Sequence, residues 1–327
     1  MAVYITIDGG TTNTRMQLVC DGTVIASRKI SRGAGSGILG RDAWCSAIAQ
    51  TIGQILADAP QYANHVACIL ASGMITSEFG LYKVDHIPAP ASIKALHDNL
   101  VQVMLPDISE IPFVFVPGVI LRGDAVDMMR GEETELAGIW NAAYGECIYV
   151  LPGSHTKIIE TDHEGQITGF STLLTGEMAN ALSAHTILAD AVDLRIDTFD
   201  QTALCEGYRY SREFGINRAL FQVRIRKNVL KQTPVEVYSF FLGCILSDEI
   251  AEILRYPQKT VVIGGRAPLR MALYTLLTEY GDRTVICLSD EDVEHSVIRG
   301  VIRIYEWNNE SIGNINRKNK SERKTFS

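Results

Sequence analysis

Three short glycine turns carry residue types that let a ligand approach the backbone, and the first two also carry the hydroxyl and cationic side chains that bind phosphate groups. The first turn, residues 8–15, reads DGGTTNTR; the second, residues 152–157, reads PGSHTK; the third, residues 262–266, reads VIGGR. Glycine lets the backbone approach a ligand closely, and successive N–H groups with neighbouring hydroxyls can surround phosphate oxygens. The sequence therefore favours a phosphate-binding protein, although each turn alone is also compatible with an ordinary chain reversal.

The first turn combines donors, a carboxylate and a cation. Its expected phosphate ligands are Gly10, Thr11 and Thr12. Asp8 stands at the end of an apolar strand pattern, where its carboxylate could hold Mg²⁺ through water. Arg15 adds a permanent positive charge.

The second and third turns complete a nucleotide-binding set. The second turn supplies phosphate-binding groups and one cation, namely Gly153, Ser154, His155 and Lys157. In the third turn, Gly264 and Gly265 could let an adenine and its ribose lie against the backbone. Two glycine–hydroxyl turns that face each other across a cleft would hold the two ends of a triphosphate, so the pairing is more informative than either turn alone.

Two adjacent carboxylates, Glu132 and Glu133, stand at the expected start of a helix. Acids in the first turn of a helix complement its dipole, and that is a sufficient structural explanation. A carboxylate ionised at neutral pH can also accept a proton from a substrate hydroxyl. Both interpretations stay open for this stretch.

The elements that must position these residues form a strand pattern that occurs twice. We expect strands at residues 3–7, 15–20 and 23–30, and again at 147–151, 156–161 and 166–172. Asp21-Gly22 is a strong hairpin signal between two of them. Gly10 and Gly153 stand 143 residues apart, which indicates a duplication on the scale of a domain.

Helical periodicity follows each set of strands. Helices are expected at 42–58, 177–191, 198–215, 235–255, 269–280 and 292–307, with further strands at 66–71, 260–263 and 284–288. Strands followed by helices, twice, predict two α/β domains. We place the N-terminal domain at 1–125, the C-terminal domain at 126–307 and a disordered polar tail at 308–327.

Composition narrows the class of partner and compartment. The 327 residues carry a net charge of −8, which argues against a nucleic-acid partner and favours a small-molecule substrate. Seven cysteines without a CxxC pair suggest reduced thiols. We expect no membrane association and a cytoplasmic location, and leave open whether the chain forms a homo-oligomer.

Residues 35–40, GSGILG, formally match the GxGxxG dinucleotide fingerprint. The fingerprint also requires an acid at the end of the next strand, whereas residues 66–71 lead into Ser72-Gly73. An NAD(P)-dependent oxidoreductase is therefore the less favoured hypothesis, and the segment is interpreted as a glycine-rich substrate loop.

Taken together, the motifs resemble the sugar kinase, Hsp70 and actin superfamily, and within it the 2-dehydro-3-deoxygalactonokinase family. The matching stretches, within residues 3–306, are IDGGTTNTR (7–15), SGMI (72–75), MRGEET (129–134), LPGSHTK (151–157) and LTGE (174–177). This chain has Gly9 where the family often carries Trp, and Arg266-Ala267-Pro268 after the third turn instead of small polar residues.

The resemblance implies two duplicated ribonuclease H-like (actin-like ATPase) domains with a cleft between them, and ATP with Mg²⁺ as cofactors. It implies phosphorylation of the C6 hydroxyl of 2-dehydro-3-deoxy-D-galactonate, with Glu133 as the base, Glu132 as the fallback, and Lys157 and Arg15 neutralising charge on the transferred group. The expected substrate-binding residues are Asn13, Gly33, Gly73, Met74, Lys83 and Arg130. The alternatives are a kinase of another 2-keto-3-deoxy sugar acid or of a hexose, and a non-catalytic nucleotide switch.

Overall fold

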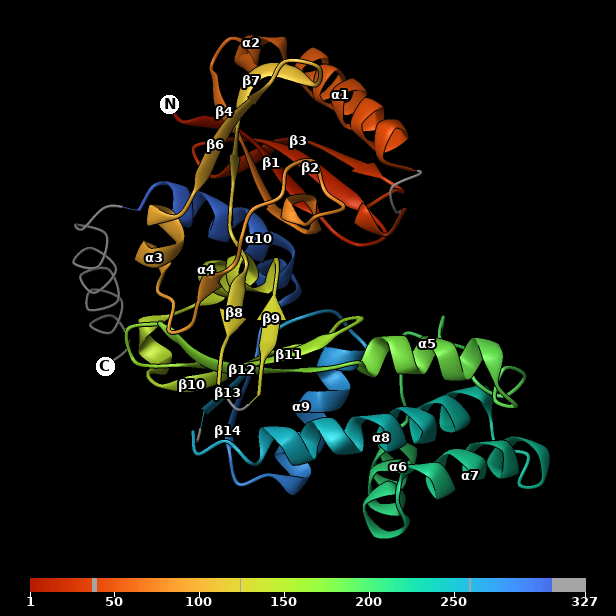
Figure 1. The fold of residues 1–327 in the computed structure, drawn as a ribbon. Coiled ribbons are helices and arrows are strands. Elements are labelled where there is room, and N and C mark those ends of the chain that lie inside the picture. The colour runs from red at the N-terminus through yellow and green to blue at the C-terminus, as the bar shows by residue number, and fades with distance from the viewer. Residues whose placement is uncertain (37–39, 124, 259, 308–327) are drawn as a thin grey trace, which may run out of the picture. The chain divides into compact units, whose positions relative to one another are not determined.

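The computed structural model describes residues 1–307 apart from 37–39, 124 and 259 (Figure 1). The described chain divides into two compact units. Unit 1 comprises Met1–Ala143, Gly165–Thr168 and the residues from Glu294 on; unit 2 comprises Tyr144–Glu164 and Gly169–Val293. The expected domains, 1–125 and 126–307, follow the repeated strand pattern, whereas the two units follow the contacts within the chain. The division into these two domains stays a prediction. The expected tail, 308–327, lies outside the described residues.

Unit 1 is built on a six-stranded mixed sheet with the order β3-β2-β1-β4-β7-β6. Its strands are β1 Val3–Gly9, β2 Thr14–Cys20, β3 Thr23–Ile30, β4 Val66–Gly73, β6 Val101–Leu105 and β7 Ser109–Phe115. β1 pairs antiparallel with β2 and parallel with β4, and β4 pairs parallel with β7. The carboxyl ends of β1 and β4 therefore lie side by side, and the first turn begins there.

Successive side chains along each strand point to opposite faces of this sheet, and each face packs against other elements. On one face, Ile5 and Ile7 pack with Trp44 and Ile48 of α1 (Arg41–Asp58), which runs along the sheet in Figure 1. On the other face, Tyr4 meets the edge of the Tyr305 ring in α10 (Asp290–Tyr305) with ring centroids 5.5 Å apart.

The helix that follows Arg130 is held in unit 1 by close backbone contact. This helix, α4 (Glu132–Ile139), packs on α10 through two glycines. A Cβ on Gly138 would lie 1.8 Å from the Ser296 carbonyl oxygen, and one on Gly300 would lie 1.8 Å from the Thr134 carbonyl oxygen. Arg303 adds hydrogen bonds to the carbonyl oxygens of Ala137 and Trp140. The position of α4 is thus set by contacts with a helix more than 150 residues further along the chain.

The remaining elements of unit 1 are short. A three-stranded sheet contains β5 Ile87–Pro88, β8 Val119–Leu121 and β9 Asp127–Met129. The small helices are α2 Pro60–Ala63, α3 Ile93–Asp98 and the 3₁₀ turns Ala34–Ser36, Met74–Thr76 and Ala142–Tyr144.

Unit 2 contains a five-stranded sheet with the order β12-β11-β10-β13-β14. Its strands are β10 Cys147–Leu151, β11 Thr156–Thr161, β12 Ile167–Leu173, β13 Thr260–Ile263 and β14 Thr284–Cys287. β10 pairs antiparallel with β11 and parallel with β13, as β1 does with β2 and β4. The duplication and the ribonuclease H-like topology expected from the sequence are confirmed. The expected cleft concerns the mutual placement of the two domains and stays a prediction.

Helices cover one face of the second sheet. They are α5 Thr175–His185, α6 Gln201–Phe214, α7 Ile216–Asn228, α8 Pro234–Ile253 and α9 Leu269–Tyr280. The inner side chains of the sheet, among them Ile148 and Val150, share a core with Phe240 and Phe241 of α8. Thr233 and Glu236 form a reciprocal capping box at the start of α8, which satisfies backbone donors that the helix leaves open.

Two local expectations were wrong. The helix expected to reach residue 191 ends at His185, because the Thr186 hydroxyl bonds the Leu182 carbonyl oxygen and its backbone turns extended. Helix α7 was not predicted, because of its residues only Ala219 and Val223 are buried and its apolar period is weak. Within the part of the chain that the structure describes, no helix has the length and apolar character needed to traverse a bilayer.

Candidate active site

The first turn is closed by its own backbone and clamped by a second segment. The Gly10 N–H donates to the Asn13 carbonyl oxygen at 2.9 Å, and Thr11, Thr12 and Asn13 remain exposed. The carbonyl oxygens of Gly10 and Thr11 accept from the N–H groups of Ala34 and Gly35 at 3.2 and 2.8 Å. The exposed Thr hydroxyls are thus presented on a fixed backbone.

Gly33 and Gly35 pack closely against the backbone of the first turn, which explains why glycines stand there. A Cβ on Gly33 would lie 2.2 Å from the Gly10 carbonyl oxygen, so only glycine fits there. Gly33, expected to bind substrate, is buried against the turn. The dinucleotide fingerprint at 35–40 falls partly on residues 37–39, outside the described residues, and the described Gly35 packs on Thr11.

Three glycines bring distant segments of unit 1 to one point. Gly9 and Gly73 are partners in the parallel pairing of β1 and β4. Gly73 has φ +83°, and a Cβ on it would lie 2.7 Å from the Gly9 carbonyl oxygen. Gly131 has φ +119°, and its Cβ would lie 3.2 Å from the Gly73 Cα. Side chains at these positions would separate the backbones, so glycine allows the first turn, Met74 and the Arg130–Glu133 stretch to converge.

Glu133 lies in the first turn of α4 and is only 1% exposed. Both of its carboxylate oxygens accept from the Gly131 N–H at 2.8 Å, and the Thr134 hydroxyl donates to Oε1 at 3.2 Å. Burial raises the pKa of Glu133 to about 7, the charge of Glu132 adds to this, and the hydrogen bonds oppose it. A carboxyl group with this pKa can accept or hold a proton near neutral pH.

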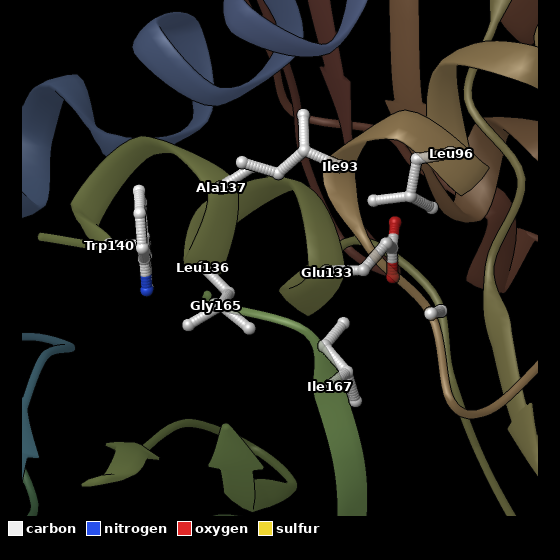
Figure 2. A pocket seen from close by; sticks show the side chains of 9 residues that line it. Ile93, Leu96, Glu133, Leu136, Ala137, Trp140, Gly165 and Ile167 are labelled. Atoms are coloured by element: carbon white, nitrogen blue, oxygen red, sulfur yellow. The ribbon is translucent and has the colours of Figure 1, made fainter. Parts of the chain in front are cut away.

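A small, mostly apolar cavity adjoins this carboxylate. In Figure 2 the Glu133 side chain extends from α4 toward Leu96. The cavity is about 10 Å³, roughly room for one water molecule. Its lining is Ala91, Ile93, Leu96, Glu133, Leu136, Ala137, Trp140, Gly165 and Ile167. Glu133 thus brings a carboxylate into a lining that is otherwise apolar apart from the indole of Trp140.

Arg130 ties the glutamates to a neighbouring loop. Nη1 donates to the Thr76 carbonyl oxygen at 2.8 Å and to its hydroxyl, and Nη2 donates to the Val84 carbonyl oxygen at 2.9 Å and contacts the His86 ring. Both terminal nitrogens are therefore used within unit 1. Lys83, in the same loop, is exposed. Of the two cations expected to bind the substrate, Lys83 is the more accessible.

Glu132 has a local backbone partner of its own. Its carboxylate accepts from the Arg130 N–H at 3.1 Å, just as Glu133 accepts from Gly131. Both carboxylates therefore accept backbone N–H groups just before α4 and stabilise the start of this helix. This agrees with a structural role for both glutamates, and a catalytic role is a separate hypothesis.

The residues around Asp8 fit a Mg²⁺ ion held largely by water and phosphate. Asp8 is half-buried at the end of β1, in register with Arg15 on β2 and Ser72 on β4. The buried Ser72 hydroxyl has no hydrogen-bond partner among the described residues. No group of three or more Asp, Glu, His or Cys that could hold a metal ion occurs within those residues, and Mg²⁺ commonly needs only one or two carboxylates beside phosphate.

In unit 2 the second turn packs on the start of α5. A Cβ on Gly176 would lie 2.3 Å from the Gly153 carbonyl oxygen and 2.8 Å from the Ser154 Cα. The Glu177 N–H donates to the Ser154 carbonyl oxygen at 3.1 Å, and its carboxylate pairs with His155 at 3.0 Å. The sequence gives the stretch Thr175-Gly176-Glu177 no evident role, although a glycine just inside a helix start indicates close backbone contact.

Lys157 is more buried than expected for a residue that meets a ligand. It is 4% exposed, its ammonium donates to the Thr172 hydroxyl, and it lies 5.9 Å from the centre of the Phe170 ring. Within unit 2 it therefore links β11 to β12.

The third turn rests on the second. The Gly264 N–H donates to the Val150 carbonyl oxygen at 2.9 Å. Gly265 has φ +70°, and a Cβ on it would lie 2.6 Å from the Pro152 carbonyl oxygen. Arg270 donates to the Gly265 carbonyl oxygen at 3.1 Å, while Arg266 is exposed. The second turn, the third turn and the start of α5 thus meet in one place within unit 2.

The comparisons with known proteins agree with one another. The model of the 2-keto-3-deoxy-galactonokinase family matches residues 8–304. The 2-dehydro-3-deoxygalactonokinase of Escherichia coli (strain K12) is 27% identical over 262 residues, 78% of this chain and 82% of that protein.

Solved structures show the same relation. A crystal structure from Sinorhizobium meliloti, of a protein provisionally named a 2-dehydro-3-deoxygalactonokinase, is 25% identical with a TM-score of 0.75, covering 92% of this chain and 97% of that chain. The activator of the 2-hydroxyisocaproyl-CoA dehydratase from Clostridium difficile, solved with bound ADPNP, has a TM-score of 0.50 at 11% identity, covering 98% of this chain and 97% of that one, and shows the shared fold alone.

Proposed function

The chain belongs to the 2-keto-3-deoxy-galactonokinase family, and from that premise we propose that it phosphorylates 2-dehydro-3-deoxy-D-galactonate with ATP. The acceptor is the terminal C6 hydroxyl, and the products are 2-dehydro-3-deoxy-6-phosphogalactonate and ADP, in the catabolism of D-galactonate. The family consists of kinases that use an alcohol group as acceptor, so the oxidoreductase hypothesis loses its support.

Glu133 is the general base of the proposed reaction, and its environment carries the proposal. The C6 oxygen attacks the γ-phosphorus, the bond from that phosphorus to the bridging oxygen breaks, and ADP leaves with the electron pair. The hydroxyl proton passes to the Glu133 carboxylate, whose pKa near 7 suits both its uptake and its later release. Because the side chain is 1% exposed, the C6 hydroxyl has to reach the carboxylate at its buried position, where burial keeps the pKa near 7.

Each unit carries its own groups suited to a nucleotide. In unit 1, Thr11 and Thr12 donate to phosphate oxygens, Gly10 lets the phosphate approach the backbone closely, and Arg15 supplies positive charge. In unit 2, the second turn binds phosphate through Gly153, Ser154 and His155, and the third turn accommodates the adenosine at Gly264 and Gly265. Lys157, whose ammonium donates to Thr172 and has two further N–H donors, would neutralise charge on the transferred group. Mg²⁺, held near Asp8, would supply charge neutralisation on the phosphates.

The sugar acid is recognised by residues of unit 1. Lys83, exposed on its loop, attracts the substrate carboxylate, while Asn13 and Met74 line the sugar site. Arg130, with both terminal nitrogens engaged, acts by holding its loop against the glutamates. Gly33 and Gly73 contribute by allowing close backbone approach.

We also propose a cytoplasmic location, which the seven free cysteines support. A metabolic kinase of this kind needs ATP, and free thiols persist in a reducing compartment.

An ADP-release assay with MgATP and a panel of acceptors tests the function. The panel contains 2-keto-3-deoxygalactonate, 2-keto-3-deoxygluconate and simple hexoses. We expect the highest kcat/KM with 2-keto-3-deoxygalactonate. A higher value for another acceptor would reassign the substrate, and nucleotide binding without sugar-dependent turnover would instead indicate a nucleotide switch.

A further inference from the structure

Helix α8 contains a buried carboxyl group that the proposed reaction does not use. Glu249 is 0% exposed, and neither of its carboxyl oxygens has a hydrogen-bond partner among the described residues. Its neighbours along α8, Leu246, Ile250 and Ile253, belong to the apolar core. Burying a carboxyl group without partners costs several kcal/mol, so this position requires an explanation.

Two hydroxyls lie close enough to influence this carboxyl group without completing a hydrogen bond to it. Glu249 interacts with the side chains of Thr156 and Thr175, and burial outweighs both and raises its pKa to about 7. The Thr156 hydroxyl is itself buried without a partner in the described part of the chain. A carboxyl group that retains its proton can donate to one hydroxyl and accept from the other, so the three groups can satisfy one another after a small shift.

Both threonines lie next to the phosphate-binding backbone of unit 2. Thr156 is the first residue of β11, directly after Ser154 and His155. Thr175 is the first residue of α5, directly before Gly176, whose backbone touches Gly153 and Ser154. Glu249 therefore lies under the junction between the second turn and the start of α5.

We propose that Glu249 is a positioning residue for nucleotide binding. Through hydrogen bonds to Thr156 and Thr175 it fixes this turn against the first residues of α5. A turn that is already held in its binding arrangement loses less conformational freedom when it binds a phosphate group. This inference rests on the proposed function, because it assumes that the second turn binds a nucleotide.

Isothermal titration with MgADP on purified variants tests the proposal. Glu249→Met removes both polar atoms at similar volume, whereas Glu249→Gln keeps one acceptor and one donor. We expect Glu249→Met to weaken MgADP binding at least tenfold and Glu249→Gln to stay within about threefold of wild type. In the coupled assay, Glu249→Met raises the KM for ATP and leaves that for the sugar acid within about twofold.

Ser247→Ala is the matched control on the same helix. Ser247 is buried and its hydroxyl pairs with Ser211 of α6 at 2.8 Å, away from the second turn. We expect it to lower thermal stability without weakening MgADP binding. If Glu249→Met does not fold, Thr156→Val and Thr175→Val replace it, and each is expected to weaken binding about threefold or more.

Three results overturn the positioning role. They are wild-type affinity in folded Glu249→Met (or, if that variant does not fold, in both valine variants), equal losses in Glu249→Gln and Glu249→Met, and a comparable loss in Ser247→Ala. A wild-type protein that binds MgADP but phosphorylates none of the sugar acids refutes the proposed substrate while leaving the Glu249 comparison valid. A wild-type protein that does not bind MgADP refutes both proposals.

Discussion

Replacing Glu133 by Gln should stabilise the protein while it removes activity. The pKa of Glu133 rises from 4.5 to about 7 on folding, chiefly through burial. Between these values the folded protein binds more protons than the unfolded chain, so this group makes stability fall as pH rises from about 4.5 to 7. With 1.36 kcal/mol for each pKa unit, the ionised carboxylate costs the fold about 3 kcal/mol above pH 7.

Glutamine has nearly the same shape and cannot ionise. The stability of Glu133→Gln relative to wild type should therefore increase by up to about 3 kcal/mol between pH 5 and pH 8. Urea unfolding of both proteins at the two pH values measures this difference. At pH 8 the thermal midpoint of the variant should exceed that of wild type by several degrees.

Activity should change in the opposite direction. Loss of the base should lower kcat by about 10²–10⁴-fold, because the amide of the introduced glutamine accepts no proton, while MgADP affinity stays within about threefold of wild type. An ADP-coupled assay at saturating ATP and sugar acid gives kcat. A kcat within tenfold of wild type would refute the assignment of the base, and a stability difference independent of pH would refute the buried, proton-sensitive carboxyl group.

Three further predictions concern unit 1. The kcat/KM of wild type should rise with pH through about 7, because only ionised Glu133 accepts a proton, and a flat pH–rate profile would contradict this. Gly22 has φ +79° and no atom near its Cβ, so Gly22→Ala should lower the free energy of unfolding, measured with urea, by roughly 1–2 kcal/mol. Gly73→Ala should lower it further and remove most activity, because its Cβ also meets the Gly9 carbonyl oxygen. Equal losses of stability in the two variants would contradict the close backbone contact between Gly9 and Gly73. Lys83→Met should raise the KM for the sugar acid about tenfold without lowering stability, and an unchanged KM, measured with the same ADP-coupled assay, would remove this residue from the substrate site.

Local sequence patterns predicted much of the scaffold. The expected strands 147–151, 156–161 and 260–263 and the helix 269–280 agree with β10, β11, β13 and α9. In these elements the apolar side chains repeat every two to four residues and turn residues mark the ends, so both signals can be read from neighbouring residues. Strands β5 to β9 were not predicted. All of them except β7 have five residues or fewer, and the pairing of each depends on partners that the local pattern does not identify.

The protein partners of individual site residues were not predicted, and the roles of these residues toward ligands stay predictions. Arg130 was expected to bind a substrate carboxylate, yet Thr76 and Val84 occupy its terminal nitrogens. Lys157 was expected at the transferred phosphoryl group and is buried beside Thr172. Both residues are cations, which suit an anionic ligand, but each also hydrogen-bonds a group from another segment of the chain, and the sequence does not identify that segment.

The sequence by itself determined the duplicated strand order, the three glycine turns and the place of Glu133 at a helix start, because turn chemistry and side-chain periodicity act over a few residues. The contacts of Gly73 with Gly9 and Gly131, and the packing of apolar side chains from α3 and the region of Gly165 around Glu133, follow from the tertiary structure instead. Desolvation sets the pKa of that carboxyl group, and desolvation depends on which distant segments pack around it.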